Sequence, residues 1–143
     1  MGVAPAAFEL GMRNLTGSDG ERNLEAAARW LEIVGENQND PAKAGCALRN
    51  LGVMRRVGDG VEQNAAEAVR YYRAVLDAEI APQIGKGPAA HQLGLLYFKG
   101  EGVEQSWEEA ARYFEQAVAF GYEESQELPT VTKGLLSGEI TLL

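Results

Sequence analysis

The chain has 143 residues, of which 13 are Lys or Arg and 21 are Asp or Glu, so its formal net charge is −8. With 45% hydrophobic and 24% charged residues it has the composition of a globular protein rather than a disordered one. The acidic balance argues against nucleic acid or an anionic membrane surface as the main partner, and no apolar run approaches the ~20 residues of a membrane span. The only cysteine, Cys46, cannot form an internal disulfide, and the first residues have no secretory signal pattern. We therefore expect one domain in a reducing compartment, the cytoplasm, without membrane insertion.

The dipeptide Leu-Gly recurs along the chain with spacings of 41 and then 42 residues, beginning at Leu10, Leu51 and Leu93. An alanine precedes each of these leucines by four positions, and a glycine follows each dipeptide glycine by six positions. Ten positions further on, an Ala-x-Arg triplet is followed each time by an aromatic residue. A period of this size is the signature of a stacked helical solenoid, for which three units are about the minimum.

Each unit has the pattern of two helices joined by a glycine turn. In the third unit Ala89, Leu93, Leu96 and Tyr97 fall on one helical face, and the stretch 100–102, Gly-Glu-Gly, supplies backbone freedom for the turn. The small Ala89 and Gly94 allow a second helix to approach closely.

The second helix of each unit has a sequence signal for its start. In the third unit Ser106 is followed three residues later by Glu109, and Asn64 and Glu67 hold the same places in the middle unit. This spacing is that of a capping box, in which each side chain satisfies a backbone N–H of the other residue. Gly121 then suits the end of the last of these helices.

These patterns predict an all-α fold without strands. We expect one domain over residues 4–125, with units at approximately 4–40, 44–80 and 88–125. Residues 126–143 do not continue the repeat, and the leucines there predict a short helix after Pro129 that caps the open end of the stack, or a tail.

The pattern Ala-x-x-x-Leu-Gly-x-x-Tyr-x-x-Gly-x-Gly-Val, followed by Glu-Ala-Ala-x-x-Tyr, resembles the Sel-1-like repeat, a relative of the tetratricopeptide repeat. Residues 89–125 match it nearly throughout, whereas Arg55 and Asn14 stand where a tyrosine is expected in the middle and first units. The resemblance implies a right-handed superhelical α-solenoid that acts as a scaffold or adaptor for protein–protein contacts. It implies no chemistry and no cofactor.

The repeat length departs from that family, whose units are usually described as about 36–38 residues. The extra residues lie between units, at 35–41 and at 81–88. They form either longer turns on one rim or an extended second helix followed by a loop, and such insertions cost little free energy. The short stretch 85–87, Gly-Lys-Gly, lacks the other residues of a phosphate-binding loop, and we expect it to be a turn.

By analogy with tetratricopeptide arrays, the first helix of each unit lines a concave face. Groove positions then lie two residues before, and two, five and six residues after, the repeat leucine. In the first unit these are Phe8, Met12, Leu15 and Thr16. In the other two units the expected partner-binding residues are Arg49, Val53 and Arg56, with Val57 beside them, and His91, Leu95, Phe98 and Lys99.

The charge along this region agrees with a binding role. Between Lys43 and Arg56 there are four basic residues and no acidic one, although the whole chain is acidic. A basic and partly apolar groove suits an acidic protein segment or peptide, with arginine as a bidentate anchor for carboxylates. The alternative is an ordinary solvated helix face whose arginines pair with acidic residues of a neighbouring unit.

Residues for catalysis or metal binding are few. The only histidine, His91, and Cys46 lie one unit apart, too far for a catalytic dyad, and no spacing of ligands suggests a metal site. We therefore expect no enzyme, no cofactor and no metal.

The sequence favours a scaffold that binds a protein or peptide, with no nucleic acid and no membrane as partner. The alternative is a structural spacer whose apolar repeat ends stack on other repeats, including those of a second copy. In a spacer the ends, and not the groove, are the surfaces sensitive to mutation.

Overall fold

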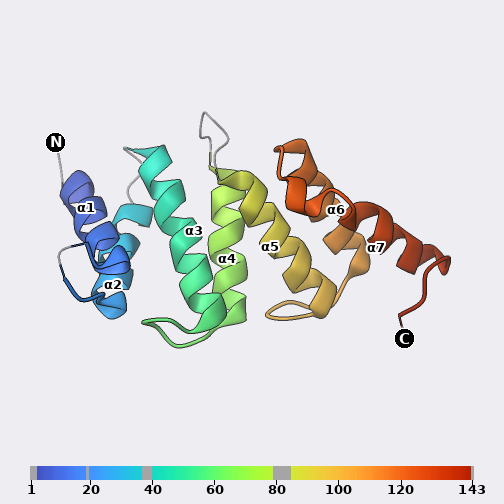
Figure 1. Ribbon diagram of the computed structural model, residues 1–143, viewed down its shortest axis with the longest axis horizontal. Coiled ribbons are helices and arrows are strands. Elements are labelled where there is room, and N and C mark those ends of the chain that lie inside the picture. Colours follow the sequence, from blue (N-terminus) through green and yellow to red (C-terminus); the bar gives the residue numbers. More distant parts are fainter. Residues whose placement is uncertain (1–2, 19, 37–39, 79–84, 143) are drawn as a thin grey trace.

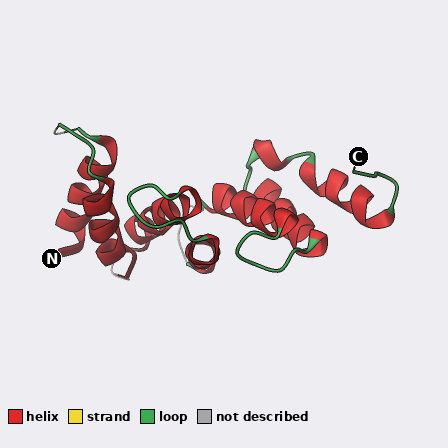
Figure 2. Cartoon of the chain, turned by 90° about the horizontal axis from the view of Figure 1, so that it is seen from below, coloured by secondary structure: helices red, strands yellow, loops and turns green. Residues whose placement is uncertain are grey.

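A computed structural model describes residues 3–18, 20–36, 40–78 and 85–142. Within those ranges there are seven α-helices, one short 3₁₀ helix and no strand, which confirms the all-α prediction. The helices follow one another in chain order from one end of the molecule to the other (Figures 1 and 2). None of the described helices is long and apolar enough to cross a membrane. Their bounds are α1 Val3–Thr16, α2 Leu24–Glu36, α3 Pro41–Val57, α4 Ala65–Asp77, α5 Lys86–Lys99, α6 Trp107–Ala119, η1 Glu123–Ser125 and α7 Leu128–Ser137.

The buried core is divided into two clusters, and each one joins neighbouring helix pairs. The first cluster contains Leu31 of α2, Leu51 of α3 and Tyr71 of α4, and so joins the first pair to the second. The second contains Tyr72 of α4 and Phe114 of α6 together with the buried face of α5. Because the core continues from one pair to the next, the chain is an α-solenoid, as the repeat predicts.

The glycine of each Leu-Gly dipeptide lies where the second helix of a unit contacts the first. A carbon added at Gly52 would lie 2.8 Å from Cε1 of Tyr72, and one added at Gly94 would lie 2.9 Å from Cζ of Phe114. Real Cβ atoms do not come this close to other atoms, so the aromatic rings occupy space that only glycine leaves free. The expected close approach of the two helices at Gly94 is confirmed.

The glycines of the turns have two structural roles: one pair ends the first helices, and the other pair contacts the preceding unit. Gly58 and Gly100 follow the ends of α3 and α5 in the left-handed conformation, with φ of 80° and 75°. Gly60 and Gly102, with φ of 73° and 74°, lie against the start of the second helix of the preceding unit. A carbon added at Gly102 would be 2.5 Å from the backbone nitrogen of Ala66, so this turn joins consecutive units.

The second helices begin at the predicted caps, but the reciprocal half of each capping box is absent. Ser106 Oγ accepts from the backbone N–H of Glu109 at 3.1 Å, and Asn64 Oδ1 accepts from that of Glu67 at 3.1 Å. The backbone N–H of Ser106 donates instead to the carbonyl of Tyr97 at 3.0 Å. The carboxylates of Glu109 and Glu67 are free to pair with arginines one turn further along, Arg112 and Arg70.

The stretches between units differ in part from expectation. The first is partly helical, because α2 continues through Gly35 to Glu36 and α3 begins at Pro41 behind its cap Asp40. In the second, α5 begins at Lys86, so the expected turn at 85–87 is wrong beyond Gly85. Residues 37–39 and 79–84 lie outside the described residues.

The C-terminal segment forms the expected helix, which starts at Leu128 rather than after Pro129 and packs on α6. Before it, η1 places Ser125 against α5, where Ser125 Oγ is 2.6 Å from Nδ1 of His91. The imidazole also lies edge-on to Tyr122, with ring centroids 5.1 Å apart. Burial lowers the pKa of His91, and the nearby Glu124 carboxylate opposes that effect.

Replacement of Gly102 by alanine should destabilise the protein more than the same change at Gly121. Both residues have left-handed φ values, 74° and 84°, so alanine costs about 1–2 kcal/mol at either position. Only at Gly102 does the added carbon also collide with the backbone of the preceding unit, whereas at Gly121 it meets nothing within 4 Å. Urea unfolding should give a loss that is larger by about 1 kcal/mol or more for Gly102→Ala. Equal losses would show that the turn does not join the units.

His91 should make the stability of the protein depend on pH. Because its pKa is lowered in the folded protein, the unfolded chain takes up the proton first as the pH falls through about 6.5. The stabilisation is therefore present above that pH and is lost as the pH falls toward the folded pKa. Unfolding free energies measured from about pH 7.5 to about pH 5 should fall more steeply for the wild type than for His91→Gln. Parallel curves for the two proteins would contradict this.

Candidate functional site

Three of the expected partner-binding residues lie together on α3. Arg49 and Arg56 are half-buried, and Val53 between them is 38% exposed. The spacing of seven residues places the two arginines on one side of the helix, two turns apart. A carbon added at Gly85 would lie 3.6 Å from Nε of Arg49, so this side chain extends toward the start of α5.

The other basic residues of the same stretch point elsewhere. Lys43 pairs with Asp40 at 3.3 Å, and its ammonium lies 5.9 Å from the centroid of the Phe8 ring. Arg55 donates to the backbone carbonyl of Glu62 at 3.0 Å. The basic run therefore divides among several directions, and only Arg49 and Arg56 share a surface.

The expected partner-binding residues of α5 make more contacts with the rest of the chain than those of α3. Leu95 and Phe98 are partly buried against the second core cluster, and the Phe98 ring stacks on Trp107 with centroids 5.8 Å apart. Lys99 at the end of the helix is exposed. His91 contacts Ser125 and Tyr122, as described above, so its imidazole belongs to the junction with the C-terminal segment.

One residue of this region was missed by sequence reasoning, namely Tyr72 of α4. Its side chain is fully buried, and its hydroxyl lies beside the guanidinium group of Arg56. Burial raises the pKa of the Tyr72 hydroxyl, and a side-chain hydrogen bond with Arg56, followed by the charges of Arg56 and Arg49, opposes that rise. The sequence did contain a sign of this difference between units. Phe114 holds the place of Tyr72 in the third unit, so the hydroxyl group is present only in the middle one of these two units.

A cleft on another side of α3 was also missed. It lies between α2 and α4 with α3 as its floor, and its volume is about 1030 Å³. Its walls combine apolar and charged residues, among them Glu32, Glu36, Leu48, Arg55, Glu67 and Tyr71. The sequence pattern identified the residues of each helix face but not the gap between two second helices.

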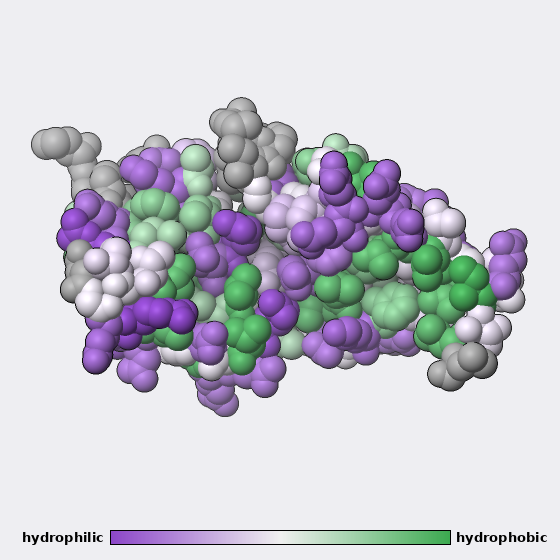
Figure 3. Space-filling model, viewed as in Figure 1, coloured by the Kyte–Doolittle hydropathy of each residue, from purple (hydrophilic) through white to green (hydrophobic). Residues whose placement is uncertain are grey.

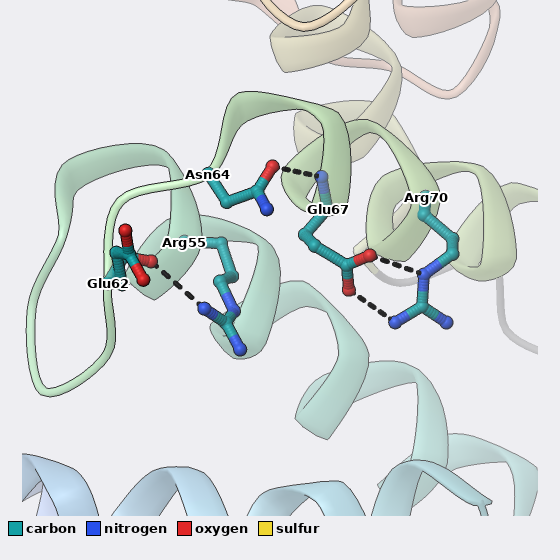
Figure 4. A network of polar contacts seen from close by, with 5 residues as sticks. All are labelled: Arg55, Glu62, Asn64, Glu67 and Arg70. Atoms are coloured by element: carbon teal, nitrogen blue, oxygen red, sulfur yellow. Dashed lines mark hydrogen bonds and ion pairs between the residues drawn. The ribbon is translucent and has the colours of Figure 1, made fainter.

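The polar contacts in the cleft are largely internal to the chain (Figure 4). Glu67 pairs with Arg70 at 2.5 Å, and this hydrogen bond lowers the pKa of the Glu67 carboxyl. Arg55 is held by the carbonyl of Glu62, and burial raises the pKa of the Tyr71 hydroxyl with a further contribution from Glu32. Arg55 and Arg70 in the cleft are thus already bound to acceptors of the chain, whereas Arg49 and Arg56 form no ion pair with a described residue.

The described residues contain no group of three His, Cys, Asp or Glu side chains placed to hold a metal ion. Cys46 is half-buried, and its Sγ lies 3.5 Å from Nδ2 of Asn50. Nδ1 of His91 is engaged with Ser125. Cys46 and His91 therefore contact different residues, and their contacts do not pair the thiol with the imidazole.

Two solved structures resemble this fold. One is a protective antigen present in uropathogenic Escherichia coli strains that displays an SLR fold, with 27% identity and a TM-score of 0.74 over 94% of this chain and 26% of that one. The other is a Sel1 repeat protein from Oxalobacter formigenes, with 25% identity and a TM-score of 0.73 over 88% of this chain and 47% of that one. The chain thus spans less than half the length of either protein.

No curated protein sequence matches the chain. The family model of the Sel1 repeat, however, matches three segments, residues 4–36, 47–74 and 87–119. Each segment contains one of the three Leu-Gly dipeptides and the residue of the second helix that packs on its glycine. Proteins of this kind are generally helical scaffolds for protein interaction and generally not enzymes. The chain belongs to the Sel1 repeat family.

Proposed function

We propose that the protein is an adaptor that binds an acidic segment of another protein on the surface formed by the first helices α3 and α5. Its central residues are Arg49, Val53 and Arg56, and Leu95, Phe98 and Lys99 of α5 extend the same surface. The proposal does not use His91, because the imidazole contacts Ser125. The single cysteine favours the cytoplasm as the place where the partner is met.

One observation supports this proposal above the others: Arg49 and Arg56 share a side of α3 and have no ion pair with any described residue. Elsewhere arginines are paired, as Arg70 is with Glu67 and Arg112 with Glu109. The alternative, that Arg49 and Arg56 lie on an ordinary solvated helix face, depends on ion pairs with acidic neighbours, and no described acidic residue pairs with either arginine. Arginines left unpaired in an acidic protein provide a local attraction for carboxylates.

A second candidate function is a spacer that stacks end to end with other repeats. It is favoured by apolar side chains exposed near the C-terminal end, where Val131 and Leu136 are each 40% exposed and Leu142 is 60% exposed. Figure 3 shows hydrophobic residues gathering over α7 and the end of the chain. Such a patch is typical of an interaction surface.

Reversal of both charges, Arg49→Glu with Arg56→Glu, should weaken binding of the partner by at least about tenfold, because it replaces two attractions for carboxylates with two repulsions. The partner is identified by affinity purification and mass spectrometry, and its affinity is then measured with purified proteins. The helical circular dichroism should be unchanged, since neither residue is in the core.

The matched control is Arg70→Glu with Arg112→Glu, which changes the net charge equally but lies on α4 and α6. These two arginines form exposed pairs that contribute little to stability. The control should retain the partner. Undiminished binding by the folded Arg49→Glu, Arg56→Glu protein, or equal loss in both proteins, would overturn the proposal.

If the spacer function holds, the protein should self-associate as its concentration rises, and Leu136→Lys should abolish this association. The reason is that lysine places a charge in the apolar patch of α7 without changing a buried residue. Size-exclusion chromatography with light scattering measures the mass. A monomer at every concentration would rule out stacking between copies.

A further inference from the structure

The cleft between α2 and α4 is a space that the packing of the helices leaves open. Its volume of about 1030 Å³ is at the upper end of the range of clefts that hold small molecules. Leu48 and Leu51 of α3 supply an apolar floor, and Tyr71 lies in the wall that α4 forms. Among the described residues no aromatic ring stacks on Tyr71, whereas Tyr97 stacks on the corresponding Tyr113 with centroids 5.4 Å apart. The cleft therefore offers both room and apolar surface.

The junction between the second and third units has larger residues at several of the corresponding positions. The two junctions can be compared residue by residue, because the Leu-Gly dipeptides align their helices and α2, α4 and α6 have equal lengths. Three alanines of the cleft, Ala44, Ala74 and Ala78, correspond to Lys86, Gln116 and Phe120. At these three positions the cleft is thus wider than it would be with the residues of the next unit.

In that next junction, cationic side chains of the chain itself stand at corresponding places. Arg73 of α4, which corresponds to Glu32, donates a hydrogen bond to the hydroxyl of Tyr97, and its guanidinium carbon lies 5.6 Å from the centroid of that ring. Lys86, in the place of Ala44, is only 7% exposed. The junction of the second and third units so accommodates two cations, whereas the cleft has a carboxylate and an alanine instead.

The cleft also has carboxylates on both walls that are available for an ion pair. Glu32 and Glu36 lie one turn apart on α2, and Asp77 lies on α4. None of these three forms an ion pair with a described residue. The Glu32 carboxylate is close enough to Tyr71 to add to the rise that burial causes in the pKa of that hydroxyl. Because carboxylates line the cleft from two helices, a cation between them is attracted by both.

We propose that this cleft binds an arginine side chain presented by a second partner, between the carboxylates of α2 and Asp77 of α4. The guanidinium group has five N–H donors, enough to bind Glu32 and a second carboxylate together. The aliphatic part of the arginine packs on Leu48, and its planar end packs against the ring of Tyr71. The contact of Arg73 with a tyrosine of the following helix is an example of such packing within the chain itself.

This site goes beyond the proposed function, because it lies on another side of α3 and binds the opposite charge. The two arginines that line the cleft do not prevent this. Arg70 is paired with Glu67, and Arg55 is held by the backbone carbonyl of Glu62. An adaptor with both surfaces holds a basic segment in the cleft while an acidic segment lies on the surface of α3 and α5.

The test uses two blocked tripeptides as probes: N-acetyl-Leu-Arg-Leu-amide, and the same peptide with citrulline, which has the shape of arginine without its charge. Each is titrated to millimolar concentration into the isotope-labelled full chain, and the methyl resonances of Leu48 are followed by NMR. We expect a saturable shift with the arginine probe and no saturable shift with the citrulline probe, because only the charged side chain pairs with the carboxylates.

Two variants introduce residues of the next junction. Glu32→Arg, which matches Arg73, should weaken binding of the arginine probe at least about tenfold, because an attraction becomes a repulsion. Ala74→Gln with Ala78→Phe narrows the cleft without changing its charge and should weaken binding as well. Both proteins should stay folded, since Glu32 is exposed and the third unit has the larger residues at these places. Helical circular dichroism and the urea midpoint check this.

A matched pair of double variants separates the cleft from the general acidity of the protein. Glu32→Gln with Asp77→Asn should weaken binding of the arginine probe about tenfold, as expected for lost charged hydrogen bonds. Glu101→Gln with Glu104→Gln removes the same charge from exposed residues in the turn of the third unit and should leave the affinity within about twofold.

Three kinds of result would overturn the inference. One is an arginine probe that does not shift Leu48, or a citrulline probe that shifts it in the same saturable way. Another is wild-type affinity in the folded Glu32→Arg protein or in the folded protein with the narrowed cleft, because the probe would then bind elsewhere. The last is an equal loss in the two double variants, which would show attraction to the net charge alone.

Discussion

The arrangement of the molecule depends on how closely the second helix of each unit lies on the first. At Gly52 and Gly94 the ring of an aromatic residue occupies the place of a missing Cβ, within 3.0 Å of where that atom would be. Dense packing of this kind fixes the position of the second helix along the first as well as its distance. A glycine also allows close contact between consecutive units, because Gly102 of one turn lies against the start of α4. The position of the Tyr72 hydroxyl follows from the same contact, because the ring that crosses Gly52 carries it to the side of α3 where Arg49 and Arg56 lie.

Most of the fold could be predicted from the sequence, because its elements depend on residues close together in the chain. The helical faces, the glycine turns and the caps Ser106 and Asn64 are local features, and they appear where the repeat places them. The capping boxes were half wrong, because Glu109 and Glu67 each have an arginine three residues further along that binds the carboxylate. A charged pair within one turn competed successfully with the backbone N–H, which has the Tyr97 carbonyl as an alternative partner at Ser106.

The candidate site was less accessible to sequence reasoning, for geometric reasons. A count of basic residues from Lys43 to Arg56 ignores that each step along a helix turns the side chain by about 100°, so adjacent Arg55 and Arg56 have different neighbours. The partner of His91, Ser125, is 34 residues away and beyond the repeat, so no periodic pattern contains it. Tyr72 was visible in the sequence only as a difference from Phe114, and its position beside Arg56 depends on how α4 packs on α3 at Gly52.

Two polar regions of the middle unit therefore differ in what they can offer a partner. In the cleft between α2 and α4 the arginines are satisfied by Glu67 and by the carbonyl of Glu62, so an acidic ligand there would have to break existing bonds. On the side of α3 that carries Arg49 and Arg56, neither guanidinium group forms an ion pair with a described residue, so a carboxylate there would not have to displace one. In the third unit the positions of Arg56 and Tyr72 are held by apolar residues, since Phe114 belongs to the second core cluster and Phe98 packs against it. Under the proposed function, Arg49 and Arg56 of the middle unit therefore serve a partner rather than the packing of the repeat.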